Sequence, residues 1–546
     1  MAADAAPARA DPLPDVTSAM DAQGSADNTT NHSDAQVFAE KEIVEAGAEE
    51  AQAEDAGSAQ GFEREQMPRR RLHFIIAGLC LLYFIAALDM TILATVYVDI
   101  SGDYNSLQSG IWIITSYLLA NTAVQPLFGK FSDILGRFEA VAGIGGGGLL
   151  SMPSVILSDI VSERERGKYT SFLAGSWGVA SAIGPVVGGA IVEHSNWRII
   201  FWINLPVCVP TAILLFFVLR LPRPSGSARE KLRRIDFLGA AVFQAFIIPI
   251  IIAFAWGGQG HSWVSGRVLG TILGSAAVGV VFLLVEWKVS PEPIVPLRLF
   301  KVRNVAVSSA AHFMLGACIY APLMFIPLWE MSVKRSTEIG AGLRTLPLMV
   351  GMVVTATISG AVTTRLGRYR VLIVLCGVLV ALGNSLLLLY KPTTSSWQRI
   401  VTLAIPGLGL GFGIQTLIIA AQCAVGGLDM AATTTLVLFM RTLGGIFSLS
   451  ILSSVFNTRL RSASSVLSAQ FPAYAGIIST SLNDESVIRE SVASLPPELV
   501  RGLADMFHDA MHRVFIGLIP FSALMVVCTL LFGHTDLNRL RKKTIK

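Results

Sequence analysis

Runs of apolar residues recur along most of the chain and alternate with short polar segments. A helix needs about 20 consecutive apolar residues to cross the hydrocarbon core of a bilayer. The pattern therefore predicts an all-α protein with thirteen membrane spans. We place them near residues 73–98, 111–130, 139–160, 170–192, 199–220, 237–256, 268–288, 305–329, 341–363, 370–390, 400–424, 432–456 and 514–533.

The first 66 residues contain no such run. They are rich in Ala, Asp and Glu, and their only basic residues are Arg9, Lys41 and Arg64. A segment of this composition cannot bury enough apolar surface to fold, so we predict a disordered acidic tail. The segment also lacks the apolar core of a cleavable signal peptide.

Composition agrees with a membrane protein, since 53% of the 546 residues are hydrophobic and only 15% are charged. The six cysteines lie in six different apolar stretches without CxxC spacing, which argues against disulfides and a zinc site. No Walker motif is present, and the eight histidines are scattered. We therefore expect neither an ATP-driven pump nor a membrane-embedded enzyme, and no cofactor or metal.

Basic clusters give the orientation, because short cytoplasmic loops are enriched in Lys and Arg. Arg69–Arg71 precede the first span, which predicts a cytoplasmic N-terminus. From residue 162 onward the basic clusters recur at every second span, with Lys334 and Arg335 as a short exception. The loop between spans at 457–512 is long and polar, and the same count places it outside.

One pair of loops breaks this pattern. The loops at 129–137 and 162–168 are both basic, yet only one predicted span separates them. One additional helix after Arg137 would return every later loop to its expected side. The alternative is a re-entrant segment or short hairpin within 138–160.

Charged residues near the first spans are the strongest functional candidates. The segment Gly129–Arg137 is a hinge that carries Lys130 and Asp133 at the end of an apolar run. Asp89 lies inside the first span, where an ionisable group is unfavourable unless it faces a cavity or a partner. We expect Asp89 to act in coupling or gating, with a purely structural hydrogen-bonding role as the alternative.

Small residues are concentrated in the predicted span at 170–192, which becomes the fifth span if one helix is added after Arg137. The stretch Gly175–Gly189 contains the sequence Gly-Pro-Val-Val-Gly-Gly from Gly184, and Trp197–Pro206 follows it. Glycines let helices approach closely, and proline removes a backbone donor. A packing face without a role in transport is the alternative interpretation.

Polar residues also occur in apolar stretches farther along the chain. Gln415 and Gln422 share a helical face, and Arg441 follows in the next span. These groups either line a cavity or form hydrogen bonds between helices. His508 and His512 are spaced for a metal, but an amphipathic helix that leads into the last span is the favoured interpretation.

These motifs resemble the major facilitator superfamily, in particular its fourteen-span drug:proton antiporter group. The hinge resembles the loop between the second and third helices of that family, and Thr364–Arg368 resembles a weaker repeat. The resemblance extends over about residues 68–540. It also implies that about 30 residues, including the third helix, are missing after Arg137, through a real deletion or an error in the predicted gene.

The resemblance implies two six-helix bundles with two extra helices between them. The expected parts are an acidic tail at 1–67, an incomplete N-terminal bundle at 68–220, two linker spans at 221–304, a C-terminal bundle at 305–536 and a basic cytoplasmic tail at 537–546.

The function implied by the resemblance is proton-coupled export of a drug, toxin or secondary metabolite such as a glycolipid. Proton coupling or gating is expected at Asp89, Lys130, Asp133, Arg137, Arg198 and Arg441. Helix packing is expected at Gly175, Gly184, Pro185, Gly188 and Gly189. A substrate cavity is expected at Gln125, Gln415 and Gln422.

Two other functions stay open, namely a vacuolar transporter of basic amino acids and a non-transporting remnant or sensor that lacks one helix. For the exporter we expect a monomer in the plasma membrane. Its partners are a small-molecule substrate, protons and the lipid bilayer, without nucleic acid.

Overall fold

The computed structural model of the chain describes residues 68–103, 113, 116–125, 146–161, 163–219, 236–258, 262–290, 293–366, 369–425, 429–482 and 495–533. Helices account for nearly all of these residues, and no strand occurs among them. The predicted all-α fold is confirmed. The long helices are α2 (Arg69–Asp103), α5 (Gly146–Ile160), α6 (Glu163–His194), α8 (Leu205–Val218), α10 (Phe237–Gly258), α11 (Gly266–Lys288), α12 (Arg303–Ser332), α13 (Glu338–Leu366), α14 (Arg370–Leu386), α15 (Ser396–Gln422), α16 (Met430–Gln470) and α19 (Pro497–Leu530).

Short elements connect these helices. They are α7 (Ile199–Trp202), α17 (Ala475–Ser481) and the 3-10 helices η2 (Leu297–Lys301), η3 (Leu387–Leu389) and η5 (Pro472–Tyr474). In the part of the chain that is described, 11 helical segments are long and apolar enough to cross a membrane. Each of them overlaps one of the predicted spans.

The other two predicted spans lie near the expected gap. The span at 111–130 is described as helix at 116–125, and the span at 139–160 as α5, which begins at Gly146. At 1.5 Å per residue, α5 is about 22 Å long. It is therefore shorter than the hydrocarbon core of about 30 Å.

Helices α2 and α6 pack side by side and run in the same direction. Ser176 donates to the carbonyl of Cys80, Gly188 lies against Val96, and Trp197 after α6 donates to Asp103 at the end of α2 (2.8 Å). Two parallel helices require an odd number of crossings between them. The two spans predicted there make an even number, so the conflict found in the basic loops is also present in the helix directions.

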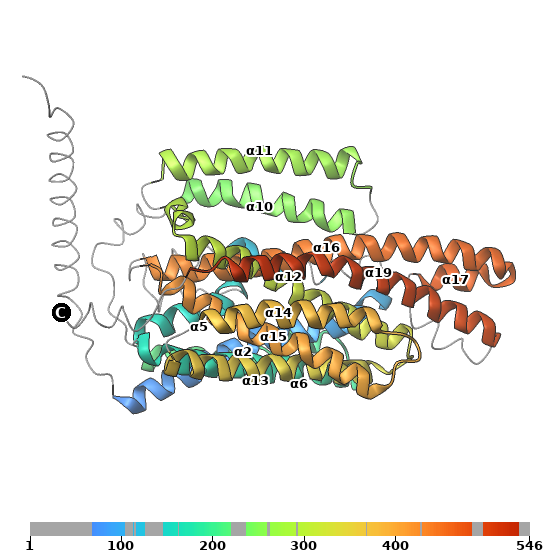
Figure 1. Cartoon of the computed structure of the whole chain (residues 1–546), viewed down its shortest axis with the longest axis horizontal. Helices are drawn as coiled ribbons and strands as arrows, with labels where there is room; N and C mark the ends of the chain where they lie inside the picture. Colours follow the sequence, from blue (N-terminus) through green and yellow to red (C-terminus); the bar gives the residue numbers. More distant parts are fainter. Residues whose placement is uncertain are drawn as a thin grey trace, which may run out of the picture. The chain divides into compact units, whose positions relative to one another are not determined.

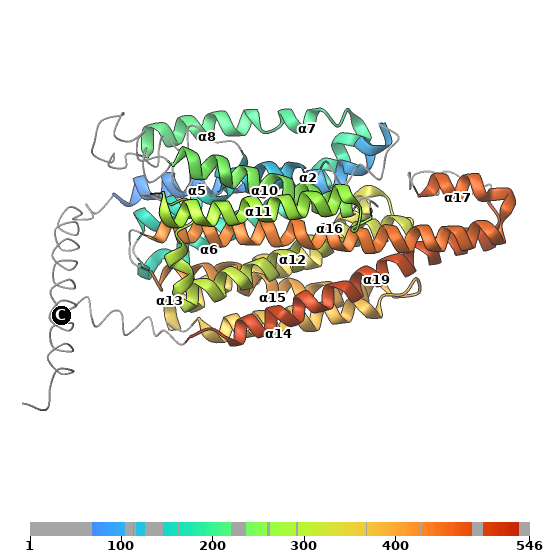
Figure 2. The same cartoon turned by 90° about the horizontal axis from the view of Figure 1, so that it is seen from above.

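The second half of the protein is held together by close helix contacts (Figures 1 and 2). Helix α12 packs on α16, α13 packs on α15, and α14 packs on both α15 and α19. Gly316 of α12 lies directly on the Arg441 carbonyl, and Gly444 of α16 lies on the Phe313 carbonyl. A Cβ at either glycine would overlap backbone, so α12 and α16 touch along their main chains.

The two extra helices form a separate pair. Helix α11 packs on α10, and α10 packs on α16 through the rings of Phe254 and Phe447, whose centroids are 4.0 Å apart. Gln244 of α10 also donates to the Ala123 carbonyl (2.6 Å), in the helical segment 116–125. Helix α10 therefore contacts elements from both halves of the chain.

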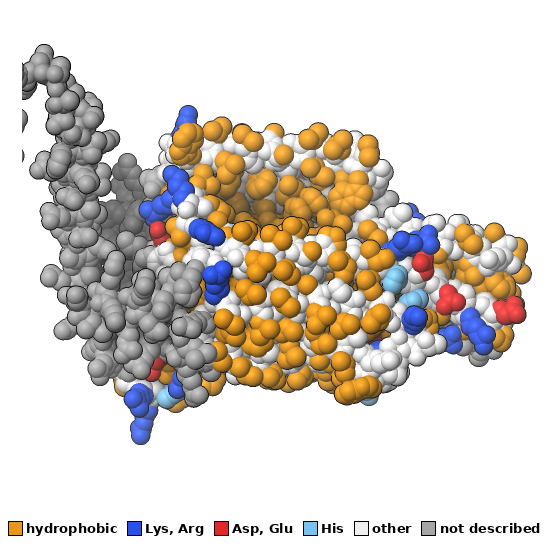
Figure 3. Space-filling view, in the orientation of Figure 1, with side chains coloured by type: hydrophobic (Ala, Val, Ile, Leu, Met, Phe, Trp, Pro, Cys, Tyr) orange, Lys and Arg blue, Asp and Glu red, His pale blue; other side chains and the backbone are white. Residues whose placement is uncertain are grey.

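The outer surface of the helices is apolar. In Figure 3 hydrophobic side chains cover the middle of the helices, and the Lys, Arg, Asp and Glu side chains in view lie towards their ends. Large apolar side chains such as Trp202, Phe217 and Leu273 are more than half exposed. A surface of this extent requires lipid rather than water around it.

The prediction of a long polar loop at 457–512 was wrong. Helix α16 continues to Gln470, and α19 begins at Pro497. With 41 residues, α16 is about 60 Å long and extends well beyond the thickness of a bilayer. The predicted helix that leads into the last span is confirmed, because His508 and His512 both lie in α19.

Candidate functional site

The acid of the first span is bound to the start of a distant helix. Asp89 lies partly buried in α2, and its Oδ1 accepts a hydrogen bond from Nδ2 of Asn204. Asn204 is the residue before α8, in the stretch Trp197–Pro206. Asp89 also lies close enough to Tyr117 and Cys208 for its charge to act on both. The carboxylate therefore has polar neighbours but no basic partner among the described residues.

The glycines of α6 hold that helix against α2. A Cβ at Gly184 would overlap the side chain of Thr91, and a Cβ at Gly188 would lie 3.1 Å from Val96. Thr91 follows Asp89 by two residues. Close packing at Gly184 and Gly188 therefore fixes the part of α2 that carries the acid. Gly189 is buried in the same stretch, and the side chain of Pro185 lies outside the described residues.

The opposite face of α6 contacts α13. Gly178 lies directly on the side chain of Val353, and a Cβ at Gly175 would lie 4.0 Å from the Thr357 hydroxyl. Ser171 donates to the Thr357 carbonyl (3.1 Å). Helix α6 thus lies between the acid-bearing helix of the N-terminal half and a helix of the C-terminal half.

A small cavity lies where these helices meet α15 and α16. Its polar lining consists of Gln415 and Arg441, which are 2% and 4% exposed, and Tyr83 and Trp177 form its aromatic side. The Arg441 guanidinium lies over the Trp177 ring, 5.7 Å from its centroid. The cavity measures about 10 Å³, which is about the room that one water molecule needs.

A second, apolar cavity of about 20 Å³ lies between α2, α12 and the segment 116–125. It is lined by Met90, Leu93, Tyr117, Leu118, Tyr320, Leu323, Met324 and Leu449. The Tyr320 hydroxyl donates to the Met90 sulfur (3.9 Å). Tyr320 also lies near Arg441, so the two cavities are neighbours. Both are too small for an organic molecule in this conformation.

The remaining predicted residues lie elsewhere. Gln422 is buried and donates to Thr434 of α16 (2.8 Å), which is the interhelical hydrogen bond considered above. Gln125 is fully buried, and neither amide atom has a hydrogen-bond partner within the described ranges. Arg198 is exposed and contacts Asn196 and the Trp197 ring, away from both cavities. The hinge residues Lys130, Asp133 and Arg137 lie outside the described residues.

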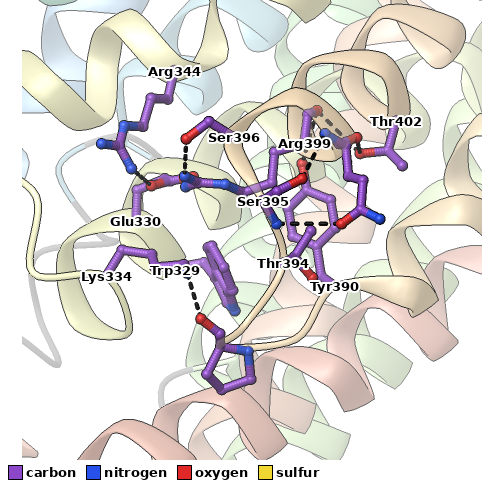
Figure 4. Close-up of polar contacts among 12 residues, drawn as sticks. Trp329, Glu330, Lys334, Arg344, Tyr390, Thr394, Ser395, Ser396, Arg399 and Thr402 are labelled. Atoms are coloured by element: carbon purple, nitrogen blue, oxygen red, sulfur yellow. Dashed lines mark hydrogen bonds and ion pairs between the residues drawn. The ribbon is translucent and has the colours of Figure 1, made fainter.

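Sequence reasoning missed a buried ion-pair cluster in the C-terminal half (Figure 4). Glu330 at the end of α12 is 1% exposed and binds two guanidinium groups. Arg344 of α13 pairs with it at 2.7 Å, and Arg399 of α15 pairs with its other oxygen. The available signal was weak, because all three residues lie at or near the ends of predicted spans, where charges are expected.

The cationic pair that broke the loop pattern lies beside this cluster. Lys334 donates to the Pro392 carbonyl, and Arg335 donates to the Val500 carbonyl (3.4 Å). Burial lowers the pKa of Lys334, and the charge of Arg399 lowers it further. Lys334 is thus bound to the loop after η3 and Arg335 to the first turn of α19, which explains why these cations occur outside the basic clusters.

In the described part of the chain, membrane-length helices with an apolar outer surface, a partly buried acid and cavities between the two halves are the features of a membrane transporter. Comparison with known proteins agrees. The family profile described as Major Facilitator Superfamily matches residues 137–449. The aspyridones efflux protein of Neocamarosporium betae is 32% identical over 71% of this chain and 75% of its own length.

A second relative by sequence is also named as an efflux protein. The efflux pump aflT of Aspergillus parasiticus is 30% identical over 74% of this chain and 84% of its own length. The human organic anion transporter MFSD10 (TETRAN) aligns with 85% of this chain and 99% of its own, with 14% identity and a TM-score of 0.49. The chain belongs to the Major Facilitator Superfamily. It is a multi-pass membrane transporter and not an enzyme.

Proposed function

We propose that the protein exports small organic molecules in exchange for protons. The observation that carries the proposal is the hydrogen bond between Asp89 and Asn204. It connects the acid of the first span with the entrance of α8, inside one bundle and beside the apolar cavity. A carboxyl group at that depth binds a proton more readily than in water, because desolvation disfavours its charged form. Protonation would weaken the bond to the Asn204 amide and change the packing of α2.

The cavities support alternating access as the mechanism. Their walls come from α2 and α6 on one side and from α12, α13, α15 and α16 on the other. A substrate fits only when these two groups of helices separate. The hinge at Lys130, Asp133 and Arg137 is proposed to close the cytoplasmic side, which remains a prediction because those residues are not described.

The relatives favour export as the direction, because both are named as efflux proteins. We propose a plasma-membrane monomer with a cytoplasmic N-terminus, and the division into bundles at 68–220 and 305–536. A carrier of basic amino acids is the weaker candidate, since the buried Arg441 would repel a cationic substrate. A remnant without transport is the outcome if no flux is found.

The test uses the purified full chain in proteoliposomes. Three labelled probes with one ring system and different charge are compared, namely naphthalene sulfonate, naphthalene sulfonamide and naphthyl trimethylammonium. A pH gradient is expected to accelerate the flux of at least one probe. In Asp89→Asn the acceleration should disappear while exchange without a gradient persists, because the amide cannot bind the coupling proton.

Asp103→Asn is the matched control, since it changes an exposed acid of the same helix and keeps an acceptor for Trp197. It should remain coupled. Absence of flux for all three probes, or undiminished coupling in Asp89→Asn, contradicts the proposed function.

A further inference from the structure

Arg441 is a buried cation at the centre of the helices and lacks an anionic partner among the residues that the structure describes. It is 4% exposed and makes no ion pair within that part of the chain. Its Nε atom has no hydrogen-bond partner there either. A charge buried in this way is normally paired, because its removal from water is unfavourable. Arg399, which is also buried, follows that rule by binding Glu330.

Among the described residues, the groups around Arg441 offer no negative charge. The titratable side chains near it are His312 and Tyr320, about two turns apart on α12, and Tyr83 of α2 lines the same cavity. Neither histidine nor tyrosine is an acid that is ionised near neutral pH. Asp89 of α2 is bound to Asn204 instead. The protein thus presents a positive centre to whatever enters between the helices.

The cavity also offers recognition groups of a second kind. The Oε1 atom of Gln415 is buried and has no hydrogen-bond partner among the described residues. Arg441 lies over the Trp177 ring, and the Tyr83 ring lies tilted against the same ring, with the two aromatic centroids 5.3 Å apart. Beyond Tyr320 the second cavity is purely apolar. A ligand that satisfies this set carries one anionic group and a flat apolar body.

We propose that the protein exports aromatic organic anions and that Arg441 binds their anionic group. The anionic group of the substrate pairs with Arg441, and the aromatic ring of the substrate lies against Trp177 and the apolar cavity. The guanidinium can hold a carboxylate or sulfonate through two parallel hydrogen bonds. This inference rests on the proposed function and names its substrate class.

Equilibrium binding to the detergent-purified full chain tests the inference directly. The probes are the sulfonate, sulfonamide and trimethylammonium forms of naphthalene used above. The sulfonate is expected to bind about tenfold more tightly than the sulfonamide, and the cation most weakly, because a hydrogen bond to a charged group adds about 1.4 kcal/mol. Arg441→Gln should remove the preference for the sulfonate and leave sulfonamide binding nearly unchanged. Arg441→Lys should retain part of it.

Arg267→Gln serves as the matched control. Arg267 also lies over a tryptophan ring, that of Trp256 at 4.1 Å, but it is exposed on α11. This variant should keep the wild-type order of affinities. Binding of the sulfonamide by Arg441→Gln shows that the variant is folded. The proposal is overturned if the sulfonate does not bind best to the wild type. It is also overturned if Arg441→Gln weakens the binding of all three probes equally, as it would if Arg441 only supported the packing of the helices.

The two proposals fail separately. Selective sulfonate binding without gradient-driven flux leaves the anion site in place and removes proton-coupled export. Gradient-driven flux with a preference for the neutral or cationic probe supports the exporter and removes the anion site.

Discussion

The contribution of a charged residue to stability depends on its burial, and two acids of the C-terminal half illustrate this dependence. Glu330 is buried and binds Arg344 and Arg399, whereas Asp509 is 39% exposed and binds Arg459, which is 43% exposed. Removing one partner of a buried pair leaves the other charge uncompensated. Removing one partner of an exposed pair changes the stability little, because water solvates the charge that remains.

Glu330→Gln is therefore expected to destabilise the protein by about 3–5 kcal/mol. Asp509→Asn should change the stability by about 0–1 kcal/mol. Thermal unfolding of the two purified variants, followed by intrinsic fluorescence at the same detergent concentration, provides the comparison. If Glu330→Gln melts at the temperature of Asp509→Asn, the cluster in Figure 4 does not stabilise the ends of α12, α13 and α15.

Helix α6 is closely packed on two faces, since its glycines touch α2 and α13. Gly274 of α11 is in the opposite situation, because a Cβ there would meet nothing within 4 Å. The same substitution on the two helices therefore separates the effect of packing from the effect of losing a glycine.

Gly184→Ala should push α6 away from Thr91 and shift the segment of α2 that carries Asp89. Overpacking of this kind costs about 1–3 kcal/mol. We expect reduced stability and a loss of gradient-driven flux in proteoliposomes, whereas Gly274→Ala should retain both. Normal flux in Gly184→Ala would show that close contact of α2 and α6 is not needed for coupling.

The whole molecule is constrained by the direction of its helices. Asp103 ends α2, Glu193 lies in the last turn of α6, and Glu165 lies in its first turn, with all three side chains exposed. Because α2 and α6 are parallel, Asp103 and Glu193 belong to one side of the membrane and Glu165 to the other. The chain must therefore cross an odd number of times between Asp103 and Glu163.

Single cysteines at these positions test this topology in a background without the six native cysteines. A membrane-impermeant maleimide applied from outside should label Asp103→Cys and Glu193→Cys and spare Glu165→Cys until the membrane is permeabilised. Labelling of all three from the same side would rule out the parallel arrangement of α2 and α6.

Much of the fold could be predicted because a membrane span is a local property of sequence. Eleven predicted spans have matching helices, and the two extra helices occur where expected. The ends of α16 and α19 could not be predicted in this way. Their polar extensions lie beyond the apolar runs, and contacts such as that of Arg459 with Asp509 stabilise them.

The candidate site was predictable only in part. Asp89 and Arg441 were evident as ionisable groups in apolar stretches, and Gln415 as a polar one. Their partners were not evident, because Asn204 is 115 residues from Asp89 and Glu330 is 69 residues from Arg399. Hydrophobic periodicity contains no information on which helices become neighbours.

By itself, the sequence determined that the protein is helical, that it is a membrane protein and which family it resembles. The length of the apolar runs and the short motifs are local properties of the sequence, which require no knowledge of the tertiary structure. Only the tertiary structure decided which buried charges have an oppositely charged partner among the described residues and which do not. The helices meet through contacts between residues far apart in the chain. Those contacts bring two arginines to Glu330 and place Arg441 over the Trp177 ring, without an ion pair among the described residues.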